Sequence, residues 1–354
     1  MKKACMLGSG AWGTAVASVL ADNGFQVNLW CHEPEVAKAV ETKHCNEKYL
    51  PDVTLSKRIM PFTDVKKALQ DVSFVFEAIP IKFLRSVLEQ VKPYYKNTQK
   101  WVILSKGIEN ETLLFPSQII DDVFKIDVKK VVVSGPSFAK DVIAKQVTAV
   151  DIASQDKELN FELYKILTNH YFRANIIDDM LGAQIGGALK NIVAIATGML
   201  CGAGYTDNTK ALLLTKTLHE IVDFAIFLGS KKETICGLSG FGDLSLTCMG
   251  SLSRNLMVGK KLGAGENLED ILAGTHAVPE GVNTVKSIYE MISQCKLGNP
   301  DYQMVKAHPN AHRSGYKLTM SCPDEPLKLP LFEVIYEVIF ADKTVEDMVH
   351  VLKG

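Results

Sequence analysis

Lys190 is the residue whose type and surroundings most clearly suggest chemistry in this chain. It lies in the run I-G-G-A-L-K-N-I-V-A-I-A-T-G-M from Ile185 to Met199, where a helix would have no polar face apart from Lys190 and Asn191. A buried ammonium is costly unless it is paired or carries a proton at a tuned pKa. A lysine at a helix end can also extend its ammonium to solvent. The run therefore indicates a proton-transferring group or a solvent-reaching lysine.

A glycine-rich turn near the start of the chain has the spacing of a dinucleotide-binding loop. The turn follows an apolar run at residues 3–7 and precedes a helical pattern that ends before Gly24. Such a loop lets a pyrophosphate approach backbone N–H groups at the positive end of a helix. A tight turn with no ligand is the alternative. The residues of the predicted loop are Gly8, Ser9, Gly10, Ala11, Trp12 and Gly13.

Glu33 lies twenty residues beyond Gly13, near the position where an acidic side chain binds the adenosine ribose. An ordinary solvated carboxylate is the other interpretation, because the neighbouring His32 and Pro34 leave the exact position of the acidic residue after the strand undefined. A carboxylate there would repel a 2′-phosphate, whereas His32 or Arg58 could attract one. We therefore expect NAD as the cofactor, with NADP possible but less preferred.

Residues 1 to about 177 alternate β-rich runs with helical stretches, which is typical of a doubly wound, Rossmann-like parallel sheet. After about residue 178 the strands disappear and long apolar helical stretches follow. We expect an α/β dinucleotide-binding domain at 1–177 and an all-α substrate and catalytic domain at 178–354. The predicted strands are 3–7, 27–30, 74–79, 101–105, 131–134 and 147–152, and the predicted later helices are 181–200, 211–228, 268–272, 282–292 and 331–340.

Ligands of open α/β sheets bind beyond the carboxyl ends of the strands. Polar or turn-forming groups follow the predicted strands at Pro80–Arg85, at Lys106 and at Gly135–Ser137. Lys106 taken alone could be a surface charge at a strand end. Together the loops predict one ligand site.

Composition argues against several classes of partner. The 354 residues carry 39 basic and 40 acidic side chains, so nothing global favours nucleic acid or an acidic membrane. No uninterrupted apolar run reaches the roughly 18 residues of a membrane span. The eight cysteines include no C-x-x-C pair and suit a reducing compartment. We expect a cytoplasmic protein without integral membrane association.

Several motifs along the chain resemble those of the soluble NAD(P)-dependent sn-glycerol-3-phosphate dehydrogenase family. They are G-S-G-A-W-G-T-A, A-I-P, S-K-G-I-E, G-P-S-F-A, G-G-A-L-K-N, G-F-G-D-L-x-L-T-C, S-R-N and P-E-G-V, in the family's order. The resemblance covers nearly all of residues 3–296 and resumes near Leu329. It implies reversible hydride transfer between NAD(H) and dihydroxyacetone phosphate or sn-glycerol 3-phosphate, by a homodimer.

The resemblance also implies roles for particular residues. Lys190 matches the family's proton donor and acceptor, and Lys106 and Asp243 match its other catalytic groups. The implied substrate-binding residues are Lys106, Gly135, Ser137, Asn191, Thr247, Arg254 and Asn255, the last two of which would bind the phosphate. Besides the glycine loop and Glu33, the implied cofactor-binding residues are Pro80, Phe83, Lys106, Ala139, Arg254 and Glu280, with Phe138 as a second flanking ring.

The side-chain types suit this chemistry on their own. An ammonium stabilises the charge that develops on a carbonyl oxygen during hydride transfer and then protonates it. Lys106 would favour deprotonation of Lys190, whereas Asp243 would favour its charged form. The planar fork of Arg254 suits a tetrahedral phosphate. Alternatively, Asp243 could be a helix N-cap and Arg254 a solvated loop residue.

An extra segment at about 298–327 separates the last two predicted helices. It is rich in Pro, His, Lys and Ser and lacks sustained apolar periodicity, so we expect a surface excursion that is dispensable for chemistry. Cys295, His308, His312 and Cys322 could supply zinc ligands, but their irregular spacing argues against a site and we expect no metal.

Two other functions remain open from the sequence. A related dehydrogenase of a 3-hydroxy acid or a sugar phosphate would use the same fold without needing Arg254-Asn255. A non-catalytic NAD(H)-binding redox sensor would keep the glycine loop and have no use for a buried lysine.

Overall fold

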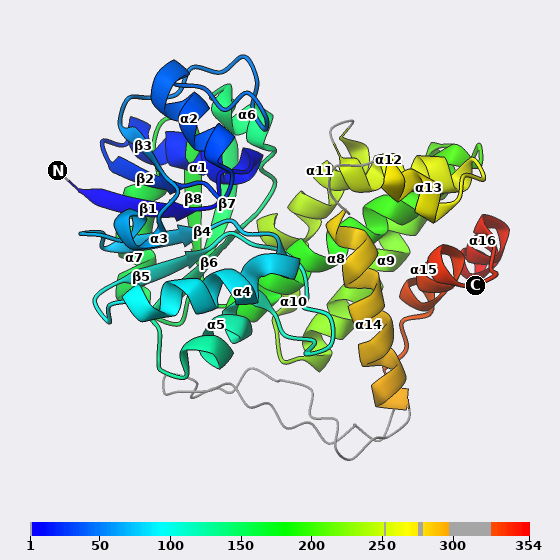
Figure 1. Ribbon diagram of the computed structural model, residues 1–354. Coiled ribbons are helices and arrows are strands. Elements are labelled where there is room, and N and C mark those ends of the chain that lie inside the picture. The colour runs from blue at the N-terminus through cyan, green and yellow to red at the C-terminus, as the bar shows by residue number, and fades with distance from the viewer. Residues whose placement is uncertain (1, 251–252, 275–278, 297–326) are drawn as a thin grey trace. The chain divides into compact units, whose positions relative to one another are not determined.

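A single eight-stranded sheet forms the frame of the first part of the chain in this computed structural model (Figure 1). The structure describes residues 2–250, 253–274, 279–296 and 327–354. The strands are β1 (Lys3–Leu7), β2 (Gln26–Trp30), β3 (Ile59–Phe62), β4 (Phe74–Glu77), β5 (Lys100–Ile103), β6 (Lys130–Ser134), β7 (Thr148–Ala153) and β8 (Phe172–Ile177).

The strand order is β3-β2-β1-β4-β5-β6-β7-β8, and neighbouring strands run parallel except at β6 and β7, which are antiparallel. The predicted doubly wound fold is therefore confirmed, but the sheet is mixed rather than wholly parallel. The inner strands β1, β4 and β6 are almost entirely buried, as expected for strands covered on both faces. The sequence missed β3, which contains Pro61, and β8, whose alternate residues are exposed.

Helices cover both faces of the sheet. In Figure 1, α1, α2 and α6 lie on one side of the sheet, and α4 and α5 lie on the other. The helices of this part are α1 (Ala11–Asp22), α2 (Pro34–Lys43), α3 (Val65–Ala68), α4 (Ile81–Val91), the short η1 (Lys92–Tyr94), α5 (Pro116–Phe124), α6 (Ala139–Ile143) and α7 (Lys157–Leu167).

After residue 180 the described part of the chain contains helices, turns and loops but no strand. Helix α8 (Met180–Gly202) contains Lys190 and is buried at every position from 181 to 200. Its length and hydropathy would suit a membrane span, but 83% of the apolar window is buried inside the protein, as in the core helix of a soluble fold. Around it are α9 (Asp207–Phe227), α10 (Lys232–Cys236), η2 (Leu238–Gly242), α11 (Asp243–Met249), α12 (Arg254–Gly263), α13 (Leu268–Ala273), α14 (Glu280–Lys296), α15 (Pro330–Phe340) and α16 (Val345–Lys353).

Contacts divide the chain into a sheet unit, residues 2–105 and 116–180, and a helical unit, which holds residues 106–115 and the described residues after 180. The sequence places residues 106–115 in the first domain. They join the helical unit because Ile108 and Phe115 are buried in its apolar core and Asn110 accepts a hydrogen bond from Ser287 at 2.7 Å.

The extra segment expected at 298–327 lies outside the described residues except at its end. Leu327 is 8% exposed and belongs to the core of the helical unit, so the excursion ends before it. The zinc ligands considered at His308, His312 and Cys322, and the Cys295 side chain, also lie outside the description. Within the described residues, no group of His, Cys, Asp and Glu could hold a metal ion.

Candidate active site

The glycine loop joins β1 to α1 in the sheet unit and fits a pyrophosphate. Gly10 precedes the first turn of α1 without a side-chain cap, and that turn contains no acidic residue. A Cβ on Gly13 would lie 2.1 Å from the Gly8 carbonyl oxygen, so no larger residue fits there. A Cβ on Gly10 would meet nothing within 4 Å, which leaves room above the helix end. The indole N–H of Trp12 is buried without a partner. These features leave N–H donors for an anionic group.

A buried asparagine that the sequence reasoning missed supports this loop. Asn46 is fully buried, and its Nδ2 donates to the Ser9 carbonyl oxygen and to Thr14 Oγ1, both at 2.8 Å. Asn46 Oδ1 accepts from the Tyr49 N–H at 3.3 Å. The residues near 46–50 are thereby fixed against the loop. An asparagine between a helix and a turn carries no signal that would have revealed this role.

Glu33 follows β2 at the carboxyl edge of the sheet, where the sequence expected it. Its carboxylate accepts from Lys48 Nζ at 2.5 Å and from the Tyr49 hydroxyl at 2.9 Å. Although partial burial opposes the shift, these hydrogen bonds lower the pKa of Glu33. Arg58 lies instead at the amino end of β3, and its guanidinium is near Gly24. Arg58 therefore cannot attract a 2′-phosphate at the carboxyl edge, and that expectation was wrong.

The other predicted residues of the sheet unit also follow strands. Pro80 precedes α4, and Phe83 stands in its first turn with 53% of its surface exposed. Ser137 follows β6 and donates to the Gly135 carbonyl oxygen at 2.9 Å. Ala139 begins α6 after Phe138. Each of these residues lies at the carboxyl end of a strand, where open α/β sheets bind ligands.

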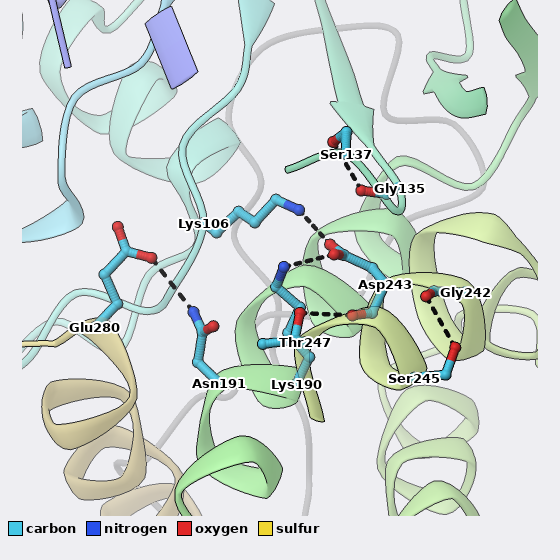
Figure 2. A network of polar contacts seen from close by, with 10 residues as sticks. All are labelled: Lys106, Gly135, Ser137, Lys190, Asn191, Gly242, Asp243, Ser245, Thr247 and Glu280. Carbon is cyan, nitrogen blue, oxygen red and sulfur yellow. Dashed lines mark hydrogen bonds and ion pairs between the residues drawn. The ribbon is translucent and has the colours of Figure 1, made fainter. Parts of the chain in front are cut away.

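In the helical unit, one carboxylate bridges two ammonium groups. Figure 2 shows Lys106 and Lys190 pointing toward Asp243 from different segments of the chain. Lys190 Nζ donates to Asp243 Oδ1 at 2.5 Å, and Lys106 Nζ donates to Oδ2. Asp243 and Lys190 are buried, and the Lys106 side chain is 16% exposed. Lys190 is therefore not a lysine that extends to solvent.

Close packing of α8 and η2 brings these groups together. Gly186 stands one turn before Lys190, and a Cβ on it would lie 2.4 Å from the Ser239 carbonyl oxygen. Only glycine permits this approach, which places η2, and Asp243 directly after it, beside α8. Asp243 is the first residue of α11, Gly242 is its N-cap, and no side chain caps the helix. The N-cap interpretation of Asp243 was therefore wrong, because its carboxylate binds the two lysines.

The neighbours of Lys190 tune its pKa. Burial lowers the pKa of Lys190 to about 8, Asp243 opposes the shift, and the charge of Lys106 adds to it. Asp243 and Lys106 thus shift the pKa of Lys190 in opposite directions, as the sequence predicted. Thr247 Oγ1 donates to the Asp243 carbonyl oxygen at 2.6 Å, one turn along α11. An amine with a pKa near 8 can give up and take back a proton close to neutral pH.

The remaining polar residues lie at helix N-termini. Arg254 is the exposed first residue of α12, whereas Asn255 is buried and its Oδ1 accepts from the Gly281 N–H at 3.1 Å. Glu280 begins α14 and accepts from Asn191 Nδ2 at 3.3 Å. Burial raises the pKa of Glu280, and the positive charges of Arg254, Lys190 and Lys106 oppose this. Three cations thus lie within electrostatic reach of Glu280, and a region with several positive charges suits an anionic ligand.

Comparison with known proteins agrees with both halves of this arrangement. The family model described as the NAD-dependent glycerol-3-phosphate dehydrogenase N-terminus matches residues 3–160, and the C-terminus model matches residues 179–350. The chain belongs to this family. It is thus an NAD(P)-dependent oxidoreductase, and a non-catalytic redox sensor or a dehydrogenase of another family is set aside.

Individual relatives match over most of the chain. A glycerol-3-phosphate dehydrogenase [NAD(P)+] from Bacillus subtilis is 41% identical over 85% of this chain and 88% of its own length. One from Bacillus cytotoxicus is 36% identical over 100% of this chain and 96% of its own. The solved glycerol-3-phosphate dehydrogenase from Coxiella burnetii has a TM-score of 0.87 at 27% identity, covering 100% of this chain and 99% of that one.

Proposed function

We propose that this chain interconverts dihydroxyacetone phosphate and sn-glycerol 3-phosphate with Lys190 as the proton donor and acceptor. The observation that supports this most directly is the Asp243 carboxylate shared by Lys190 and Lys106 in a buried cluster. A carbonyl oxygen that gains negative charge needs a nearby cation that can also release a proton. Lys190 has both properties, since its pKa is lowered to about 8.

The residues of the cluster divide the work of proton transfer. Bound NADH would supply the hydride to the carbonyl carbon. Lys190 holds the proton that passes to the carbonyl oxygen, and in the reverse direction the neutral amine removes it from the hydroxyl. Asp243 orients the Lys190 ammonium and partly balances its charge. Lys106 binds the other carboxylate oxygen, and its positive charge lowers the pKa of Lys190, so Lys190 releases its proton more easily.

Arg254 and Asn255 are proposed to bind the substrate phosphate. Both stand in the first turn of α12, where the helix dipole favours an anion beside the N-cap Ser253, whose hydroxyl accepts from the Leu256 N–H. The exposed guanidinium of Arg254 can make two hydrogen bonds to a phosphate. Gly135, Ser137, Asn191 and Thr247 stay proposed substrate contacts, and Pro80, Phe83, Phe138, Ala139 and Glu280 stay proposed cofactor contacts.

We propose NADH as the preferred coenzyme, with some use of NADPH. Glu33 is ionised and lies after β2, where it would accept hydrogen bonds from the adenosine ribose and repel a 2′-phosphate. Lys48, paired with Glu33, offers a cation that tempers this repulsion. The values of kcat/KM for the two coenzymes test the assignment. Comparable values would remove Glu33 from the ribose site.

The experiment that tests the function is an NADH oxidation assay on a panel of carbonyl compounds. Dihydroxyacetone phosphate should be reduced far faster than unphosphorylated dihydroxyacetone and faster than 2-oxo and 3-oxo acids. Equal rates with dihydroxyacetone would contradict the phosphate site at Arg254. Preference for an oxo acid would contradict the substrate.

We also propose a cytoplasmic homodimer. The cysteines whose side chains are described, at positions 5, 31, 45, 201, 236 and 248, are all free, which suits a reducing compartment. The dimer rests on the resemblance to the family alone. Light scattering on the purified protein would test it, and a monomer at working concentration would contradict it.

A further inference from the structure

Glu77 is a fully buried carboxyl group in the sheet unit that the proposed chemistry does not use. It is the last residue of β4, in the centre of the sheet, and its register partners are Leu7 on β1 and Ile103 on β5. The groups that shift its pKa within the described chain are all uncharged. Lys106, the residue after its partner Ser105, has its ammonium bound to Asp243. A buried carboxyl without a cation is costly as an anion.

The hydrogen bonds around Glu77 connect two loops. Its Oε2 accepts from the Ile79 N–H and its Oε1 from the Ser105 N–H, both at 3.4 Å. Ser105 Oγ contacts Oε2 and also lies 2.5 Å from the Ile79 carbonyl oxygen. A serine hydroxyl has one hydrogen, so it cannot serve both oxygens as a donor. If the carboxyl is neutral, it donates to Ser105 Oγ, and the serine donates to Ile79.

The two loops tied in this way are those of the proposed coenzyme site. Ala78 donates to the Leu7 carbonyl oxygen at 2.9 Å, directly before the glycine loop. A Cβ on Gly8 would lie 2.7 Å from the Ala78 carbonyl oxygen, so residues 78–79 pack closely under that loop. The second loop begins at Ser105 and continues into Lys106.

We propose that Glu77 is a positioning residue, a neutral carboxylic acid that holds residues 78–79 and Ser105 in the geometry that binds NADH. The inference rests on the proposed binding of the dinucleotide at the glycine loop. A glutamate among the apolar residues of F-V-F-E-A-I-P was the signal in the sequence, and it was missed.

Ionisation of Glu77 should loosen this arrangement. Burial raises the pKa of Glu77 to about 8, since hydrogen bonds from Ser105, Ile79 and Leu104 offset only part of the cost. Between the ordinary carboxyl pKa and about 8 the folded protein binds more protons than the unfolded chain, so this contribution to the free energy of unfolding falls as pH rises. Above pH 8 a buried anion replaces the donor to Ser105.

NADH titrations of the full-length protein across pH 8 test the proposal. Wild type should bind NADH roughly tenfold more weakly well above pH 8 than below it, because a buried hydrogen-bond link is lost. Glu77→Gln is neutral and keeps a donor and an acceptor, so its affinity should not change across this range. Glu77→Leu should bind roughly tenfold more weakly at every pH. Glu89→Gln, on the exposed face of α4, is the matched control and should follow wild type.

Further variants keep the test decisive if Glu77→Leu does not fold. Ser105→Ala should weaken NADH binding, and Glu77→Gln combined with it should be no weaker than Ser105→Ala alone, because both changes act on one link. A Glu77→Gln variant that keeps the pH dependence of wild type would overturn the proposal, as would a Ser105→Ala variant that binds NADH normally.

A readout without coenzyme separates this proposal from the proposed function. Amide exchange at Ile79 and Ser105 in the free protein should accelerate above pH 8 more than intrinsic exchange does, and Glu77→Gln should abolish the excess. If wild type fails to bind NADH while this excess is seen, the coenzyme assignment fails and the role of Glu77 in the loops stands. If the excess is absent, the role of Glu77 fails.

Discussion

Burial decides the chemistry of single residues in this protein, and Lys190 is the clearest case. Its ammonium is buried beside Asp243, whose other carboxylate oxygen binds the less buried ammonium of Lys106. At a solvated surface the same side chain would keep its proton throughout the physiological range.

We predict that Lys190→Ala loses about a hundred- to ten-thousandfold in turnover, the usual cost of removing a general acid. NADH should still bind, because the glycine loop belongs to the sheet unit. Lys190→Arg should rescue little, since a guanidinium keeps its proton. Steady-state kinetics and NADH fluorescence measure the two effects. Near-normal turnover in the alanine variant would contradict the mechanism.

The two directions of the reaction should depend on pH in opposite ways. Burial, with help from Lys106, lowers the pKa of Lys190 to about 8, so its protonated form is lost as pH rises through that value. Reduction needs the protonated amine and should slow through pH 8, whereas oxidation needs the neutral amine and should accelerate. The midpoint of each measured pH profile belongs to Lys190, Asp243 and Lys106 together, because their protonation states depend on one another.

Lys106→Met is the variant that checks this assignment. Removing the second positive charge should move the transition in both pH profiles to higher pH. Profiles that keep their midpoint in this variant would show that another group controls proton transfer.

At the scale of elements, close helix packing determines which side chains meet. Backbone carbonyl groups of neighbouring elements lie so close to Gly186 and Gly198, both on α8, that neither position has room for a Cβ. The oxygen of Ser239 would lie 2.4 Å from one such Cβ, and the oxygen of Leu256 on α12 would lie 2.3 Å from the other. The first contact places Asp243, and the second places the helix that begins with Arg254.

We predict that Gly186→Ala and Gly198→Ala have different kinetic effects. An added methyl at position 186 must push η2 away, so kcat should fall for phosphorylated and unphosphorylated substrates alike. At position 198 it displaces α12, so KM for dihydroxyacetone phosphate should rise more than kcat falls. Each variant controls for the destabilisation caused by the other. The same kinetic change in both would mean that packing affects the site only through stability.

At the scale of the whole molecule, the chain leaves the described helices after residue 296 and returns to an apolar core at Leu327 and Leu329. We predict that replacing residues 298–326 with a glycine-serine linker yields a folded enzyme with a similar kcat. Every proposed catalytic residue precedes the segment, and closing a loop of a different length costs little free energy. Circular dichroism and kinetics check this. A folded variant that binds NADH but does not turn over would contradict it.

The sequence by itself determined the class of fold and most of the residue types of the site. Strands buried on both faces give continuous apolar runs, so β1, β4 and β6 were visible, and the glycine loop was recognisable between β1 and α1. The apolar run around Lys190 was informative because helix α8 is buried on all sides. Local pattern carries such information because burial selects residue types directly.

Only the tertiary structure decided which of these residues act together. The pairing of Asp243 with Lys106 and Lys190 joins positions 137 and 53 residues apart, and no local pattern could separate it from a helix cap. The short helix α12 was missed in the sequence, and its close approach to α8, where a Cβ on Gly259 would lie 1.9 Å from the Ile195 carbonyl oxygen, is visible only in the structure. Asn46, Glu77 and the assignment of residues 106–115 to the helical unit were likewise decided by contacts distant in sequence. Hydrogen bonds and charge pairs depend on where side chains meet in space, which sequence spacing alone does not specify.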